Sequence, residues 1–123
     1  MKPRSEEYLG EAKRFLAAAR VLLEAKLPEN SAAEAYQAMF AAARAALSER
    51  DREARSHHGT WSLFEDLFIR PEAFERRLRD AARNAEELRY DSDYRLGGAS
   101  LDEAARVLAD AEEFVVAIRA MFT

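Results

Sequence analysis

The strongest constraint on the fold is how rarely this sequence interrupts a helix. Among 123 residues alanine occurs 26 times, whereas glycine occurs four times and proline three times. Alanine has the highest intrinsic helix propensity, while glycine and proline have the lowest. We therefore expect an all-α protein. A chain of this length is typical of one domain with its own core, which we expect to span residues 1–123.

Apolar residues at three- and four-residue spacing predict where the first two helices lie. The first helix is predicted over residues 5–26 and ends at the turn 27–30. The second is predicted over 32–48, and Ser31 and Glu34 ahead of it have the spacing of a capping box. This second helix is apolar on nearly every side. It is therefore expected at the centre of the bundle or in an interface with a second copy.

The second half of the chain predicts a short helix and two long ones. A charged connection over 49–55 precedes the short helix, which carries Trp61, and Pro71 is expected in the first turn of the helix that follows. Ser100 and Glu103 form a second capping-box pattern ahead of the last helix. The whole pattern predicts an antiparallel up-and-down bundle of four long helices plus one short helix.

The helix after Pro71 has two faces. Its apolar stripe is predicted from Phe74, Leu78, Ala81, Ala85 and Leu88. Its opposite side is predicted to carry Arg76, Arg77, Arg79 and Arg83. Such an arginine face either steers RNA or a nucleotide phosphate, or is simply the solvated side of a helix.

Charge and composition restrict the partners. A formal net charge of −4 argues against a general nucleic-acid coat, although a local basic site remains open. The 16 arginines against three lysines suit phosphate recognition, but codon bias or adaptation to heat gives the same ratio. With no cysteine there is no disulfide framework and no thiolate ligand. Neither a signal peptide nor a membrane-spanning run is visible, so we expect a cytoplasmic protein without membrane partners.

Two polar groups of residues are candidates for chemistry. Arg52 precedes His57 and His58, and an imidazole with a guanidinium can deprotonate a ribose hydroxyl and hold the adjacent phosphate. Alternatively, Ser56 caps the short helix and both histidines lie in its exposed first turn. The spacing of the two histidines does not fit a zinc site, and we expect no metal and no cofactor.

The second candidate is the segment Arg89, Tyr90, Asp91, Ser92, Asp93 and Tyr94. Two tyrosines, an arginine and carboxylates at a helix end can form a polar pocket. Alternatively, Arg89 and Asp93 form an ordinary ion pair and Tyr94 packs over the end of the bundle.

Four segments in succession resemble the HEPN domain family, and in particular its small stand-alone prokaryotic members. They are AEAYQAMFAAARAAL, SHHGTWSLFEDLFI, LRYDSDY and SLDEAARVLADAEEFV. The resemblance covers nearly the whole chain. It implies a helical bundle that forms a homodimer, and a metal-independent ribonuclease of a toxin-antitoxin or defence pair. The second protein of such a pair is a minimal nucleotidyltransferase.

The resemblance also implies roles for particular residues. In active members an arginine and a histidine, separated by four to six residues, line a cleft at the dimer interface. Arg89 matches this arginine, but after four intervening residues this chain has Tyr94 instead of histidine, so His57 is the imidazole available to act with Arg89. By the same resemblance Tyr94, or next Tyr90, would receive a nucleotide from the partner.

Asp93 and Arg83 complete the expected RNA- or nucleotide-binding site around Arg89 and Tyr94. The alternative function is a non-catalytic helical module that binds a nucleotide or a protein.

Overall fold

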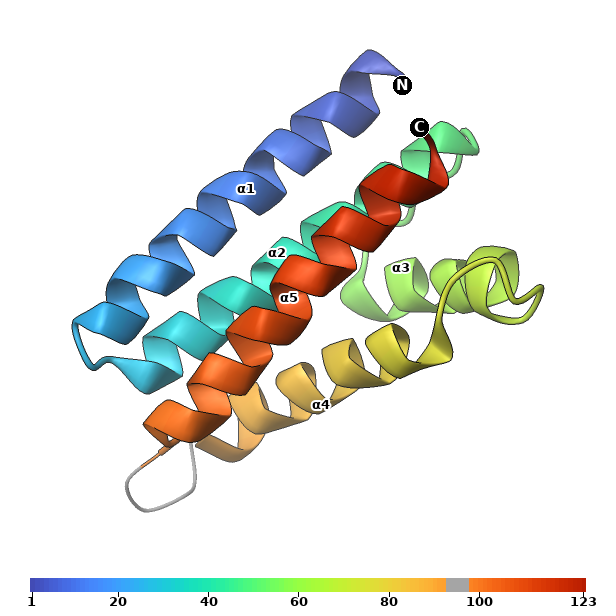
Figure 1. Cartoon of the computed structure of the whole chain (residues 1–123). Helices are drawn as coiled ribbons and strands as arrows, with labels where there is room; N and C mark the ends of the chain where they lie inside the picture. The colour runs from blue at the N-terminus through green and yellow to red at the C-terminus, as the bar shows by residue number, and fades with distance from the viewer. Residues whose placement is uncertain (93–97) are drawn as a thin grey trace.

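The computed structural model describes residues 1–92 and 98–123, and over these residues it is an all-α bundle without strands (Figure 1). Four long helices are α1 (Pro3–Glu24), α2 (Pro28–Glu49), α4 (Arg76–Ser92) and α5 (Leu101–Met121). The short helix α3 (His57–Phe64) continues into a π-helical turn, Glu65–Ile69. Successive long helices run in opposite directions, which confirms the predicted up-and-down bundle.

The second helix, α2, lies at the centre of the bundle. It packs against α1, α3, α4 and α5, and most of its residues are buried. Alanine side chains fill six of the ten positions from Ala38 to Leu47, and small side chains allow neighbouring helices to approach closely. Of the two interpretations that its apolar sequence left open, the structure supports the bundle centre.

The predicted start of α2 is wrong. The helix begins at Pro28, with Leu27 as its N-cap residue, rather than after Ser31. Proline is favoured in a first turn, where its missing N–H would have no helical partner. Ser31 lies inside the helix and is fully buried, and its hydroxyl donates a 2.7 Å hydrogen bond to the carbonyl oxygen of Ala19 on α1. Ser31 therefore joins two helices instead of capping one.

The other predicted caps are confirmed. Ser56 Oγ accepts a 2.8 Å hydrogen bond from the Gly59 amide at the start of α3. Ser100 and Glu103 form a complete capping box at the start of α5. Each cap satisfies a backbone N–H that has no partner within its helix.

The prediction that Pro71 lies in the first turn of α4 is also wrong. The π-helical turn and a tight turn over residues 70–75 precede the helix, which begins only at Arg76. Phe64, Phe68 and Phe74 are buried in this region and meet edge-on or tilted, with centroids 5.2–5.3 Å apart. Backbone hydrogen bonds from Ala73 and Phe74 to the Phe68 carbonyl oxygen close the turn, and these aromatic contacts pack beside it.

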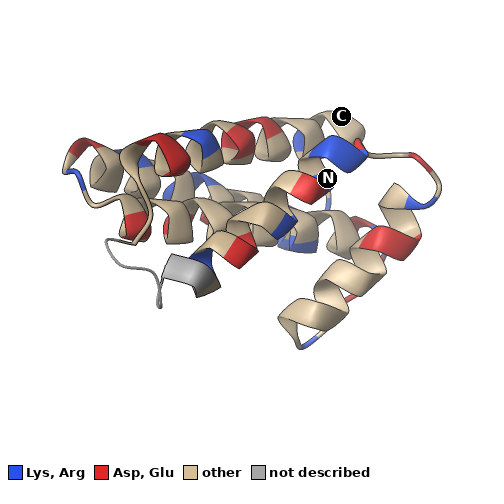
Figure 2. Ribbon diagram, turned by 90° about the horizontal axis from the view of Figure 1, so that it is seen from below, with Lys and Arg blue, Asp and Glu red and all other residues tan. Residues whose placement is uncertain are grey.

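Lys and Arg are interspersed with Asp and Glu along the helices, as Figure 2 shows. Many of these charges are paired, for example Arg77 of α4 with Glu113 of α5 at 2.9 Å. None of the helices in the described part of the chain is long and apolar enough to cross a bilayer.

Candidate functional site at the junction of α2, α3 and α4

His57 is the first residue of α3 and is exposed to solvent. Its ring stacks on Phe40 of α2, with the centroids 3.9 Å apart and the planes inclined by 12°. Its Nδ1 atom lies 3.4 Å from the hydroxyl oxygen of Tyr36, which is one helical turn before Phe40. The imidazole is therefore held by α2 on one side while remaining accessible. His58 is also exposed, so both histidines occupy the first turn that the Ser56 cap predicted.

The Tyr36 hydroxyl connects three helices. It donates a 2.7 Å hydrogen bond to Glu86 Oε2 on α4 and accepts a 2.9 Å hydrogen bond from Trp61 Nε1 on α3. Tyr36 has no exposed surface. Burial is the largest cause of a strongly raised pKa, and the negative charge of Glu86 acts in the same direction. The phenol therefore keeps its proton at physiological pH.

This arrangement determines what His57 can do. A phenol has one proton, and that proton is used on Glu86, so the Nδ1 of His57 approaches the oxygen as a donor. The neutral imidazole with its proton on Nδ1 has its lone pair on Nε2. His57 can therefore accept a proton at Nε2 from a bound molecule.

Arg79 lies against Trp61, with its guanidinium carbon 4.4 Å from the ring centroid. Its Nε is 3.2 Å from Glu65 Oε1, an ion-pair distance, but the N–H points elsewhere and has no hydrogen-bond partner among the described residues. Burial is the main cause of its lowered pKa, and the neighbouring Arg83 adds to it. The prediction that Arg79 belongs to the solvated face of α4 is thus wrong, because only 7% of the residue is exposed.

Arg83 lies on the exposed surface of α4, as predicted. It contacts Glu65 Oε1 at 3.2 Å and Asp80 Oδ1 at 2.9 Å. The predicted apolar stripe of α4 is shifted at one position, because Ala82 rather than Ala81 is fully buried.

Arg89 and Tyr90 lie in the last turns of α4, and both are exposed. Glu86 precedes Arg89 by three residues, and side chains at this spacing are neighbours on a helix. The hydrogen bonds of Tyr36 therefore connect the position of His57 to the part of α4 that carries Arg89. Asp93 and Tyr94 lie outside the described residues. Arg52 lies on the connection before α3 and lines a pocket at the ends of α1 and α2.

Three residues of this junction were not identified from the sequence. Tyr36 was interpreted only as packing volume in α2, and Glu86 and Glu65 were not selected. One signal was available for Tyr36, because a buried tyrosine needs a partner for its hydroxyl. Its partners are 25 and 50 residues away, so no local spacing reveals them.

The model of the HEPN domain family matches residues 5–121. This chain belongs to the HEPN domain family. A protein of Methanocaldococcus jannaschii named "Putative toxin MJ0605" is 30% identical over 108 residues, which cover 88% of this chain and 81% of the relative. The "UPF0332 protein glr0978" of Gloeobacter violaceus is 32% identical over 119 residues, covering 94% and 93%. A "UPF0332 protein" of Archaeoglobus fulgidus is 34% identical over 109 residues, covering 85% and 83%.

Family membership accounts for the order of the segments found in the sequence. The aromatic, alanine-rich helix is α2, and the segment with two histidines begins α3. The HEPN match thus spans every described helix that contributes to the Tyr36 junction.

Proposed function

We propose that this HEPN protein is the RNA-directed half of a toxin-antitoxin or defence pair, whose other half is a minimal nucleotidyltransferase. One observation carries the proposal: His57 is accessible and oriented by Phe40 and Tyr36, next to the helix that bears Arg89. The relative that is named as a toxin supports the same role. The RNA site includes Arg89, His57, Arg83 and Tyr90, together with Asp93 and Tyr94.

In the proposed reaction Nε2 of His57 takes the proton of a ribose 2′-hydroxyl. The 2′-oxygen then attacks the adjacent phosphorus, and the bond to the 5′-oxygen breaks. Arg89 compensates the negative charge that develops on the non-bridging oxygens. The leaving 5′-oxygen takes a proton from water, and His57 releases its proton to the solvent. The products are a 2′,3′-cyclic phosphate and a 5′-hydroxyl. This reaction requires no metal ion. We also propose that the cleft lies between two copies of the chain, so that the active form is a homodimer.

The test is cleavage of a labelled single-stranded RNA by the purified protein in the presence of a chelator. His57→Phe retains the stacking on Phe40 but removes both ring nitrogens, and Arg89→Gln removes the charge. General acid–base groups contribute about 10²- to 10⁴-fold, so each variant should lose at least about a hundredfold in rate. The matched controls are His58→Gln, which changes the adjacent exposed histidine, and Arg106→Gln, which changes an exposed arginine of α5.

Circular dichroism and thermal unfolding verify that each variant is folded. Unchanged cleavage by His57→Phe overturns the role of His57. Wild-type protein that binds RNA without cleaving it overturns the proposed reaction and favours the non-catalytic module.

A further inference from the structure

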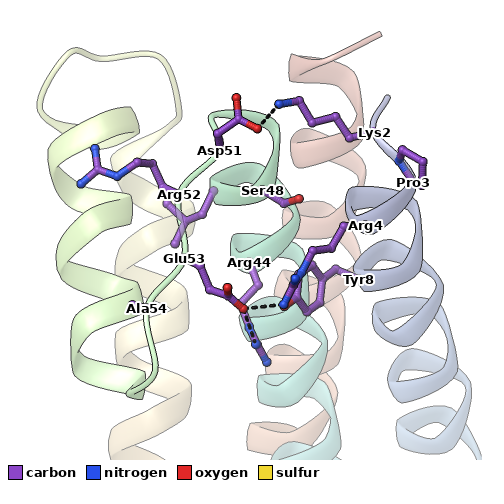
Figure 3. Close-up of a pocket in the computed structure, with 11 residues that line it drawn as sticks. Lys2, Pro3, Arg4, Tyr8, Arg44, Ser48, Asp51, Arg52, Glu53 and Ala54 are labelled. Carbon is purple, nitrogen blue, oxygen red and sulfur yellow. Dashed lines mark hydrogen bonds and ion pairs between the residues drawn. The ribbon is translucent and has the colours of Figure 1, made fainter.

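A polar cavity lies where α1 begins and α2 ends (Figure 3). It is one helical turn along α2 from the Trp61 junction, because its lining residue Arg44 lies 5.8 Å from the ring of Phe40, which stacks on His57. Its volume is about 470 Å³, which lies within the range of about 300 to 1,000 Å³ that is typical of small-ligand sites. It is lined by the first turns of α1, the last turns of α2 and the connection after α2. Neither His57 nor any residue of α4 lines it.

The cavity is positively charged although the chain as a whole carries a net charge of −4. Four basic residues and two acidic residues line it, so positive charges exceed negative charges by two. They are Lys2, Arg4, Arg44, Arg52, Asp51 and Glu53. Lys2 pairs with Asp51, and Figure 3 shows the Arg52 guanidinium directed away from Glu53. The guanidinium groups of Arg4 and Arg44 and the carboxylate of Glu53 remain as one cluster.

Both of these guanidinium groups converge on one oxygen atom. Arg4 Nη2 donates to Glu53 Oε1, and Arg44 Nη2 lies 3.9 Å from the same oxygen. Tyr8 helps to fix both side chains: its hydroxyl accepts from Arg4 Nη2 at 3.3 Å, and its ring lies 4.6 Å from the Arg44 guanidinium carbon. The two positive groups are thus oriented toward the position that the Glu53 carboxylate occupies.

From this geometry we propose that the cavity binds a small phosphate monoester, whose phosphate replaces the Glu53 carboxylate between Arg4 and Arg44. A phosphate monoester carries a charge of about −1.5 to −2 at pH 7 and balances two guanidinium groups better than one carboxylate does. Arginine binds phosphate through pairs of parallel N–H groups. Glu53 lies on the connection after α2 and its side chain is 54% exposed, so it can leave without disturbing the core.

The organic part of the ligand occupies the rest of the cavity, next to Ser48 and Ala54. In this arrangement the Glu53 carboxylate competes with the phosphate of the ligand for Arg4 and Arg44. It keeps the two arginines paired when no ligand is present, and its negative charge opposes an incoming phosphate.

The experiment is calorimetric titration of the full-length protein with adenosine 5′-monophosphate, ribose 5-phosphate and adenosine. Both phosphate monoesters should bind and adenosine should not. Arg4→Gln removes one charge-assisted contact and should weaken binding about tenfold or more, whereas Glu53→Gln should tighten it. Arg106→Gln, at a distant exposed position of α5, is the matched control and should bind as wild type does.

Measuring the affinity of Glu53→Gln for the phosphate monoesters at several pH values distinguishes phosphate recognition from nonspecific binding. The second pKa of a phosphate monoester is about 6, so affinity in this variant should fall between pH 7.5 and pH 5. Arg4 is 58% exposed in its side chain, so its replacement leaves the core intact. Three results would each overturn the proposal. The first is equal affinity of wild type and Arg4→Gln for the phosphate monoesters, and the second is binding of adenosine, which has no phosphate. The third is no binding of either phosphate monoester by wild type or by Glu53→Gln. RNA cleavage is expected to be unchanged in Arg4→Gln, so this site and the His57 site fail independently.

Discussion

Replacing Tyr36 by phenylalanine should destabilise the protein, because the Tyr36 hydroxyl forms hydrogen bonds to two other helices. The change removes only the hydroxyl oxygen and leaves the ring in place. It breaks the 2.7 Å hydrogen bond to Glu86 and leaves the Trp61 N–H without its acceptor at 2.9 Å. Trp61 is only 4% exposed, so water cannot readily replace that acceptor.

The magnitude follows from these two losses. A buried donor left without a partner costs about 1–3 kcal/mol, and a hydrogen bond to a charged group contributes about 1.5–3 kcal/mol. Glu86 is only half-buried and recovers part of its loss from water. The expected decrease in the free energy of unfolding is therefore about 2–4 kcal/mol. For a domain of this size that corresponds to a decrease in Tm of about 10 °C.

The assay is urea and thermal unfolding followed by circular dichroism. Tyr8→Phe is the matched control, because the Tyr8 hydroxyl only accepts long hydrogen bonds of 3.3 and 3.4 Å from the exposed Arg4. It should cost less than about 1 kcal/mol. A loss in Tyr36→Phe no larger than in Tyr8→Phe would refute the argument that the hydroxyl holds α2, α3 and α4 together.

The same residue gives a pH dependence of known sign. Burial raises the pKa of Tyr36 in the folded protein, whereas in the unfolded chain the phenol ionises near pH 10. The contribution of the Tyr36 proton to stability is therefore complete below pH 10 and is lost as the pH rises above it. The difference in stability between wild type and Tyr36→Phe should accordingly shrink above pH 10.

Three further predictions concern other parts of the molecule. Burial raises the pKa of Asp110, so Asp110→Asn should raise Tm at pH 7, and the gain should disappear below about pH 4, where the carboxyl is protonated in both states. Gly98 has φ of 63°, and an added Cβ would lie 1.5 Å from Glu29 Oε1, so Gly98→Ala should lower the unfolding free energy in urea by about 1 kcal/mol. If the partner nucleotidyltransferase modifies Tyr94, mass spectrometry should detect one added nucleoside monophosphate on the wild type and none on Tyr94→Phe, with Tyr90→Phe as the control.

Most of the architecture could be predicted from the sequence because its signals are local. Helix propensity and three- to four-residue spacing identified four long helices and a short one, and Ser56 and Ser100 marked two helix starts. The prediction for Ser31 was wrong because a serine that forms a hydrogen bond to a neighbouring helix has the same local sequence pattern as a serine that caps its own helix. The prediction for Pro71 was wrong because a tight turn, next to the buried rings of Phe68 and Phe74, separates this proline from the start of α4.

The candidate site was only partly predictable for a related reason. His57 was a candidate from its residue type and from the resemblance to the HEPN family, and the exposed position of Arg83 on α4 was predicted correctly. The role of Tyr36 depends on contacts with Trp61 and Glu86, which only the packing of α3 and α4 against α2 brings together. The sequence pattern assigned Arg79 to a solvated arginine face, whereas its guanidinium lies over the ring of Trp61 and the residue is buried. The environments of Tyr36 and Arg79 thus depend on contacts between helices, which local sequence patterns do not reveal.

We propose that His57 and Arg89 act in the same step of RNA cleavage. The most direct measurement is the cleavage rate, in chelator, of wild type, His57→Phe, Arg89→Gln and the double variant. Residues that act as a unit have strongly non-additive effects. The proposed mechanism predicts that each single variant loses at least about a hundredfold and that the double variant is within about tenfold of the slower single variant. Losses that multiply in the double variant, or a single variant that cleaves as fast as wild type, would contradict it.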